Sequence, residues 1–530
     1  MPRVLAPLSL ALLLTACGGE DGATSSPASD AAPTTDATGG ASTGASADTS
    51  GGETASAAPT TGSGTQGGSA GESTGEMAQP GPWDEGWVVP ETPQIPGDPE
   101  AGREALLNAG YVTCGIPYIM FGLTKGLLGD FAAGEPLPGR TGKNAEVPYN
   151  WTVHTPKSGV EIASLNCLEC HAGRFNGELV LGLGVTEADF TTVPMGDLLD
   201  NLPILDIFPG ALGELEKFAG RYKAVGPHIK MLTVGTNPAD MLAVQLARHH
   251  DVDTLAWSDE PLKDIPDVMA PVDPPPWWRT AKKHALFYNG MNRGDHRGTM
   301  MFASSLCTDT VAEASEVLAY FNNINAYLES LRAPKYPFAI DVDLAAAGAP
   351  VFAAHCAGCH GTYAADDADE TYPNLLLPLA VIGTDATLAA SGAAELRPMV
   401  DWFNASYFGT ILQLVVDVPF VGYVAPPLDG VWATAPYLHN GSVPTLAALL
   451  ASDTRPTYWK RVDFDSKNFD QAALGWPFTA LPYGQDGAPD DERKYVYDTT
   501  KTGHGNGGHI FGDPLTDEER AAVLEYIKTL

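Results

Sequence analysis

The sequence predicts a mainly α-helical fold in two parts, with long loop-rich insertions, behind a disordered N-terminal segment. The chain ends in LTDEERAAVLEYIKTL, where Thr516 and Glu519 have capping-box spacing and apolar residues recur on one helical face. Residues 343–360 are expected to form an Ala-rich helix, and a further helix is expected around residues 98–110. The stretches between them hold many of the 43 prolines and 57 glycines, which indicates long loops and few strands.

Residues 1–17 have the pattern of an export signal. Arg3 precedes the apolar stretch VLAPLSLALLLTA, which is shorter than the roughly 20 residues that span a bilayer. It ends in Leu-Thr-Ala-Cys at 14–17, which resembles a bacterial lipobox, and this implies that Cys17 carries a lipid. A cleaved signal peptide with a chance cysteine is the alternative. Gly18 carries no acidic retention signal, so we expect a lipoprotein of the outer membrane or cell surface, on the periplasmic or extracellular side.

Residues 18–80 are expected to form a disordered linker. They are rich in Gly, Ser, Thr, Ala and Pro, lack Lys, Arg and aromatic residues, and contain Met77 as the one large apolar side chain. Such a segment cannot bury enough apolar surface to offset an ordering entropy of about 1–2 kcal/mol per residue. The folded part is therefore expected to begin near Trp83.

The charge balance bears on possible partners. The chain has 30 Lys and Arg against 65 Asp and Glu, a formal net charge of −35. Binding to phosphate backbones needs a basic surface, so nucleic acid is not an expected partner. Contact with a membrane is expected only through the N-terminal lipid.

Two short cysteine motifs indicate the chemistry. Of the seven cysteines, four lie in the strings CLECH at 167–171 and CAGCH at 356–360. C-x-x-C-H is the attachment signature of c-type haem: both thiols bond the porphyrin, and the adjacent histidine binds the iron. A zinc or redox-active cysteine pair is the alternative, but zinc would need further paired ligands nearby. The sequence therefore predicts two covalently bound haem c groups, with these residues in attachment and ligation: Cys167, Cys170, His171, Cys356, Cys359 and His360.

Each motif is expected to belong to its own cytochrome c-like haem domain. An N-terminal domain would span residues 81–335 and a C-terminal domain residues 336–530. The expected helix before each motif and the amphipathic helix at the C-terminus are typical of that domain class.

Two cysteines remain after the lipid-bearing and haem-attaching residues are set aside. They are Cys114 and Cys307. In an oxidising compartment an even remainder predicts a disulfide, with two separate buried thiols as the alternative.

Several longer segments resemble a known family. They are AGYVTCGIPY, NAEVPYNWTVHT, NCLECHAGRFNG, PPPWWRTAKKHALFYNGMNRGDHR, PLDGVWATAPYLHNGSVPTL and GHGNGGHIFG. Together they resemble the di-haem cytochrome c peroxidase superfamily, and within it most closely the secreted di-haem rubber oxygenases and their relatives. The resemblance covers about residues 90–530. It implies an N-terminal haem where O₂ or peroxide reacts and a C-terminal haem that transfers electrons.

The two irons are expected to differ in their sixth ligand. The resemblance implies that a C-terminal histidine completes the second iron, and His509 in the glycine-rich GHGNGGHIFG is the first candidate. His439 and His504 are rivals. Tyr423 lies near the place where protein-oxidising relatives have a tyrosine ligand, and Met399 has the spacing of a methionine ligand, although a core methionine is the simpler interpretation.

No histidine or methionine stands out as a sixth ligand of the first haem, which fits an open iron. Met195 is expected in the core. The pair Trp277-Trp278 matches aromatic residues that rubber oxygenases keep near and between their haems. This implies that Trp278 relays electrons and that Trp277 packs near the first haem. The alternative is an aromatic pair that only packs an interface.

Four basic residues follow the tryptophan pair. The basic residues could neutralise haem propionates or form a simple basic patch; they are Lys282, Lys283, Arg293 and Arg297. The sequence offers no recognisable candidate for a distal Glu that would assist O–O cleavage as an acid/base.

Two functions follow from these patterns. In the first, the chain is an oxidoreductase whose open N-terminal haem activates O₂ or hydrogen peroxide, acting on an organic or polymeric substrate, while the C-terminal haem transfers electrons. In the second, it is a surface-anchored electron carrier that exchanges electrons with a redox protein. The long sequence between the motifs favours the enzyme.

Overall fold

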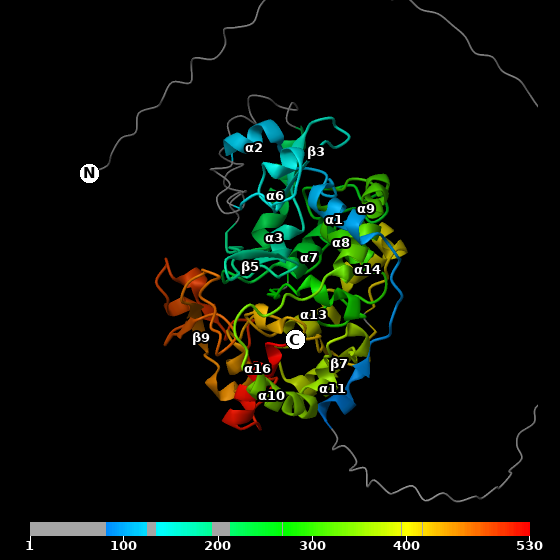
Figure 1. Cartoon of the computed structure of the whole chain (residues 1–530). Helices are drawn as coiled ribbons and strands as arrows, with labels where there is room; N and C mark the ends of the chain where they lie inside the picture. Colours follow the sequence, from blue (N-terminus) through cyan, green and yellow to red (C-terminus); the bar gives the residue numbers. More distant parts are fainter. Residues whose placement is uncertain (1–80, 125–133, 193–212, 268, 394, 416) are drawn as a thin grey trace, which may run out of the picture. The chain divides into compact units, whose positions relative to one another are not determined.

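The chain forms short helices and small sheets connected by long loops (Figure 1). The computed structural model describes residues 81–124, 134–192, 213–267, 269–393, 395–415 and 417–530. These residues belong to one compact unit. The predicted export signal with Cys17, the linker up to residue 80, and Met195 lie outside the described residues.

The helices are mostly short and spread along the whole chain. Their bounds are α1 Pro99–Asn108, α2 Tyr118–Thr124, α3 Leu168–His171, α6 Gly213–Val225, α7 Ala239–His249, α8 Arg297–Ala303, α9 Val311–Ser330, α10 Val342–His355, α11 Ala357–His360, α12 Leu379–Ile382, α13 Thr387–Ala393, α14 Arg397–Ala405, α15 Leu446–Leu450 and α16 Asp517–Ile527. A 3₁₀ helix, η5, spans Trp277–Lys282. The expected helices near residues 98–110, 343–360 and the C-terminus are confirmed as α1, α10 with α11, and α16.

The strands form small antiparallel sheets. Their order is β1-β7-β8, β2-β4-β3, β10-β9-β11 and β5-β6. The bounds are β1 Trp87–Val88, β2 Ile116–Pro117, β3 Trp151–His154, β4 Ile162–Leu165, β5 Ala172–Phe175, β6 Glu178–Leu181, β7 Leu375–Pro378, β8 Gly422–Val424, β9 Tyr458–Arg461, β10 Phe478–Ala480 and β11 Tyr497–Asp498.

These sheets correct the predicted fold class. The described residues have a mixed α and β fold, so the prediction of a mainly α fold with two cytochrome c-like domains is wrong. The reason is that most strands have only two to four residues and pair with distant segments, as β1 does with β7. Strands this short give no readable alternation of apolar and polar residues. One local signal was present: Asn176-Gly177, both with positive φ, turns β5 into β6.

Two pairs of crossing helices frame the haem motifs. Helix α1 packs on α9, and α10 packs on α16 (Figure 1). Each crossing has a glycine at its closest point. A Cβ on Gly102 would lie 1.8 Å from the Asn323 carbonyl oxygen, and one on Gly348 would lie 2.0 Å from that of Ala522. The absence of a side chain therefore sets how closely these helices approach.

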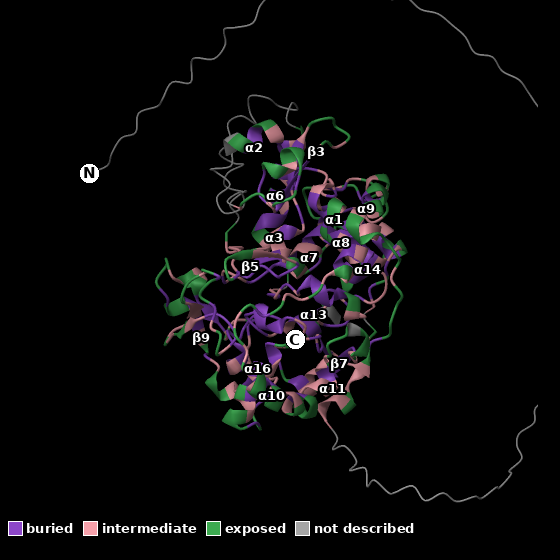
Figure 2. Ribbon diagram, viewed as in Figure 1, coloured by how far each residue is buried: buried purple, intermediate pink, exposed green. Residues whose placement is uncertain are grey.

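Buried side chains form a continuous interior through these elements. Figure 2 shows buried residues along α7 and α16. The largest core cluster joins Leu168 and Ala172, beside the first haem motif, to Phe321 of α9 and Phe403 of α14. A second cluster surrounds α16 and includes Trp278 and Trp432. In the part of the chain that the structure describes, no helix is long and apolar enough to cross a membrane.

Replacing Gly348 tests the helix crossing. Gly348→Ala places a methyl group against a backbone carbonyl of α16, and we expect a loss of about 1–3 kcal/mol in unfolding free energy. Denaturant unfolding measures this loss. The matched control is Gly220→Ala in α6, where the nearest atom to a new Cβ is 3.6 Å away. That change should be neutral or stabilise by up to about 1 kcal/mol. Equal effects of the two substitutions would contradict the packing argument.

Candidate functional site

The first C-x-x-C-H motif forms a short turn of helix at the edge of the main core. Cys167 precedes α3, which ends at His171 and leads directly into β5. Both thiols, of Cys167 and Cys170, are free. Burial lowers the pKa of His171 to about 4, so the imidazole is neutral and suited to bind a metal. The Pro275 carbonyl counteracts this shift, although His171 Nδ1 makes no hydrogen bond of normal geometry.

The second motif follows the long helix α10. Cys356 ends α10, and α11 carries Cys359 and His360, again with both thiols free. His360 Nδ1 donates a hydrogen bond to the Pro426 carbonyl at 2.7 Å, which leaves Nε2 free to bind a metal ion. A backbone carbonyl on the other ring nitrogen is the usual way to orient a metal-binding histidine. Trp83 packs over this motif, because a Cβ on Gly358 would lie 2.3 Å from its indole ring.

His509 faces His360 at a distance that suits one shared iron. The two ring centroids are 6.2 Å apart. Two imidazole rings this close could hold one haem iron between them, each through one ring nitrogen. Burial lowers the pKa of His509 to about 3, so this imidazole is also neutral.

The backbone around His509 is held in place by a second residue. His509 has a φ of 46°, and its N–H donates to the Ile382 carbonyl at 2.6 Å. The Arg455 guanidinium donates to the carbonyls of Asn506, Gly508 and His509. Gly508 is required here, because a Cβ would lie 2.1 Å from the backbone of Gly383. His509 is therefore presented on a rigid loop.

The free thiol pairs and the neutral histidines fit c-type haem. Each motif offers two thiols for attachment and one imidazole for iron, and the second motif has an opposing imidazole. When bound, haem c would supply one-electron chemistry and, at an iron with an open position, binding of a small oxidant.

The other candidate ligands have different surroundings. His439 stacks on Tyr423, with ring centroids 4.1 Å apart. The Tyr423 hydroxyl donates to the Asp385 carbonyl and accepts from the Ala389 N–H, so its hydrogen bonds are made within the protein. His504 Nδ1 bonds the Thr502 carbonyl. Met399 is buried in the core cluster of α14, as expected of a packing residue.

The two tryptophans lie on η5 and contact opposite parts of the site. Trp277 stacks on the His171 ring, with centroids 4.8 Å apart and planes at 26°. The backbone N–H of Trp277 donates to the Gly182 carbonyl, and the backbone N–H of Gly182 donates to the His171 carbonyl. Trp278 points to the C-terminal part, where its indole N–H donates to the Asp429 carbonyl at 2.8 Å. Both rings are nearly fully buried.

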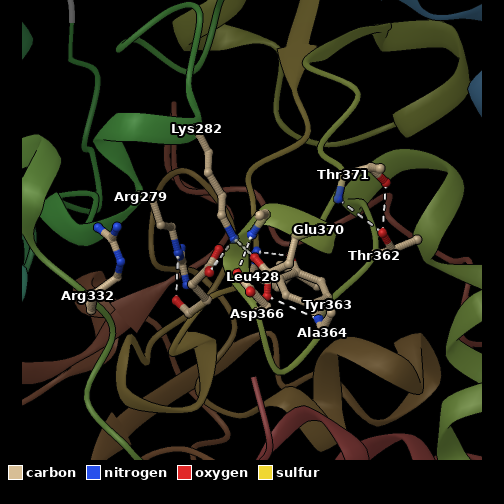
Figure 3. Close-up of polar contacts among 12 residues, drawn as sticks. Arg279, Lys282, Arg332, Thr362, Tyr363, Ala364, Asp366, Glu370, Thr371 and Leu428 are labelled. Atoms are coloured by element: carbon tan, nitrogen blue, oxygen red, sulfur yellow. Dashed lines mark hydrogen bonds and ion pairs between the residues drawn. The ribbon is translucent and has the colours of Figure 1, made fainter.

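The segment that holds Leu428 and Asp429 joins η5 to the second motif. Figure 3 shows Lys282 of η5 beside Leu428 and Tyr363. The Asp429 carbonyl also accepts from Arg279 Nε at 3.0 Å, and its carboxylate pairs with Lys282, which pairs with Glu370 as well. The next contact is local: the Tyr363 hydroxyl accepts from the Leu428 N–H and donates to the His360 carbonyl at 2.9 Å. A run of contacts thus links His171, through the tryptophan pair, to His360.

The four basic residues do not form one patch. Lys282 belongs to the Asp429 and Glu370 pair. Lys283 is half-buried, donates to the Leu286 carbonyl, and has its pKa lowered by burial to about 7. Arg293 lies over the Trp87 ring, 5.0 Å from its centroid, and Arg297 pairs with Asp295.

Sequence reasoning missed Arg279 and Asp429. Arg279 is 6 % exposed and uses only Nε in a hydrogen bond, while its Nη2 is buried without a partner among the described residues. The local signal was its position directly after the tryptophan pair. For Asp429 no local signal existed, because its partners lie about 150 positions away in the chain.

Cys114 and Cys307 form a disulfide with an S–S distance of 1.98 Å. Both are fully buried in a small core with Trp151 and Phe218. The bond ties the segment before β2 to the segment after α8, away from the cysteines of the two haem motifs.

Comparison with known proteins supports a cytochrome relationship for part of the chain. A family model described as RoxA-like, cytochrome c-like matches residues 422–460, which include β8, Asp429 and His439. The chain is 29% identical over 293 residues to the uncharacterized protein y4iJ of Sinorhizobium fredii, which covers 43% of this chain and 47% of that protein. It is 27% identical over 321 residues to the uncharacterized protein y4iM of the same organism, which covers 53% and 69%.

The first of these matches spans about half the length of the relative concerned. The family match relates residues 422–460 to rubber-oxygenase-type cytochromes c and indicates a haem-related redox function. Neither relative has an assigned activity, so the comparisons alone do not identify a reaction.

Replacing His509 tests its assignment as an iron ligand. His509→Ala should change the visible and EPR spectra of one haem from low-spin toward high-spin and leave the other haem unchanged, because the ring facing His360 is removed. His439→Ala is the matched control, since that ring stacks on Tyr423 instead. A spectral change in the His439 variant and none in the His509 variant would reverse the assignment.

Proposed function

We propose that this chain is a di-haem c-type oxidoreductase. In this proposal an open N-terminal haem at His171 activates O₂ or hydrogen peroxide, and a C-terminal haem between His360 and His509 transfers electrons. The substrate would be an organic or polymeric molecule, as in the rubber-oxygenase-type family that residues 422–460 resemble. The lipobox-like residues 14–17 support a location at the outer membrane or cell surface.

The observation that carries this proposal is the difference between the two histidines. His360 has an opposing imidazole 6.2 Å away. In the described part of the chain, the ring that pairs with His171 is the Trp277 indole, and no second imidazole pairs with it. One iron with both axial positions filled and one with an open position is the arrangement expected of an electron-transfer haem beside a reacting haem.

The chain's own residues would support electron movement between the two sites. Trp277 touches His171, and Trp278 follows it directly in the chain. The Trp278 N–H is bonded to Asp429, next to Leu428 and its contact with Tyr363. An indole held in this way can be oxidised for a short time and divides one long electron transfer into two shorter ones. The surrounding core excludes water from both rings.

An electron carrier without catalysis is the second candidate function. Both functions need two haems and access to outside partners, and both agree with the Trp278 contacts. The absence of a second imidazole beside His171 in the described residues favours the enzyme.

A resting-state EPR spectrum separates the two functions. One high-spin or O₂-bound haem beside one low-spin haem supports the oxidoreductase, and two low-spin haems support the carrier. Incubation of the protein with polyisoprene under O₂, and separately with peroxide and a reduced redox protein, then identifies the substrate class.

Replacing Trp278 tests the relay. Trp278→Phe keeps most of the packing but removes the oxidisable ring and one hydrogen bond worth about 1 kcal/mol. We expect both haems and normal folding to be retained, and turnover to fall at least tenfold in whichever assay the wild type supports.

The matched control is Trp257→Phe, which alters an indole that stacks on His249, away from the two motifs. It should leave turnover unchanged. Equal turnover of Trp278→Phe and the wild type would leave Trp278 as a packing residue.

A further inference from the structure

Arg279 is an unusual residue for the interior of a protein. Its side chain is buried, yet one of its five N–H donors is known to be used, by Nε to the Asp429 carbonyl. Nη2 is buried without a partner among the described residues. A buried donor left without an acceptor costs about 1–3 kcal/mol. The outer edge of the guanidinium therefore requires an acceptor that the described residues do not provide.

Lys283 lies within electrostatic reach of Arg279. Its ammonium donates to the Leu286 carbonyl and lies over the Tyr288 ring, 6.0 Å from the centroid. Arg279 lowers the pKa of Lys283 further, after the larger effect of burial, so the two cations lie close enough to repel each other. A buried guanidinium beside a half-buried ammonium favours an anion bound between or beside them.

The acids nearby do not fulfil this role. Lys282 engages the Asp429 carboxylate and Glu370, and Arg279 reaches only the Asp429 carbonyl. Burial raises the pKa of Asp273 well above its usual range, so this group favours its neutral form. The titratable and charged groups that face Arg279 are Asp273, Lys283, Tyr288, His360, Tyr363, Tyr372, Asp429 and Tyr437.

The position of Arg279 indicates which anion this is. Its Nε donates to the Asp429 carbonyl, and the neighbouring Leu428 N–H donates to the Tyr363 hydroxyl, which is bonded to the His360 carbonyl. The anion therefore lies on the side of the second motif. A planar fork of N–H donors matches the two oxygens of a carboxylate. The porphyrin expected at His360 carries two propionate carboxylates.

We propose that the buried Arg279 and the half-buried Lys283 form a carboxylate-binding site for a propionate of the second haem. This inference rests on the two-haem part of the proposed function and not on its catalytic part. Arg279 would act as a positioning residue. It binds the same carbonyl as the Trp278 indole, so it would fix the porphyrin edge beside the relay and set the charge around the second iron.

The test measures the reduction potential of each haem in purified full-length variants by spectroelectrochemistry. Arg279→Gln should lower the potential of the second haem, because losing a positive charge favours the ferric state. The electron-transfer equilibrium between the haems should shift at least tenfold against the second haem. Arg279→Lys should restore most of the wild-type potential. Axial ligation, seen in the low-spin spectrum, should not change in either variant.

The matched control is Arg397→Gln, which removes an exposed guanidinium paired with Asp401 on α14. Its potentials should equal those of the wild type. The melting temperature of Arg279→Gln is measured as well, because a merely structural role would lower the stability without changing either potential. A lower melting temperature with both potentials unchanged overturns the inference.

A second arm uses the wild type and does not depend on folding of a variant. Sodium acetate is titrated while the potentials are recorded. A saturable response would mean that the cluster takes a free carboxylate, and it would overturn the propionate assignment; no response supports it. Absence of haem from the second motif, measured by mass spectrometry, would instead refute the proposed function.

Discussion

The arrangement of the site depends on one backbone carbonyl, that of Asp429. It accepts hydrogen bonds from both Trp278 and Arg279, and the carboxylate of the same residue pairs with Lys282. All three donors lie on η5, while Asp429 follows the segment that carries the Pro426 carbonyl bound to His360. One residue thus fixes the distance and orientation between the element that touches His171 and the loop that orients His360.

This junction explains why the described residues form one unit although each motif has its own pair of crossing helices. Close crossings at Gly102 and Gly348 hold each motif's helices together. Such crossings are local, and they do not determine how the two halves meet. The buried contacts of η5 and the ion pairs around Lys282 provide the connection, and they run directly between the two histidines. Stability of the interface and electronic contact between the sites therefore depend on the same side chains.

Sequence reasoning succeeded where the information is contiguous. The two C-x-x-C-H strings are complete within five residues, and the capping box of Thr516 and Glu519 starts α16 as predicted. His509 was selected from a glycine-rich segment, and Gly508 does permit the close approach to Gly383. The predicted tryptophan pair lies between the two motifs.

The failures concern long-range pairing. β1 has two residues and pairs with β7, which lies far away in the chain, so this part of the mixed fold was not apparent. The buried position of Arg279 was not predicted, because its partner Asp429 is 150 positions away in the chain. The four basic residues after the tryptophans could have formed one patch, but each has a separate partner. Their spacing in the sequence did not reveal this, because spacing in a loop does not determine where side chains point.

The order of the elements along the chain has a consequence for how the protein is made. The first motif finds its contacts early: α1 comes before it, and Trp277 and α9 follow within the first two thirds of the sequence. The second motif instead waits for Arg455, His509 and α16, which are synthesised last. During synthesis the helices around the first motif can therefore meet while the partners of the second motif are still missing. Assembly of the two sites is expected to be sequential, and the second site depends directly on the last residues of the chain.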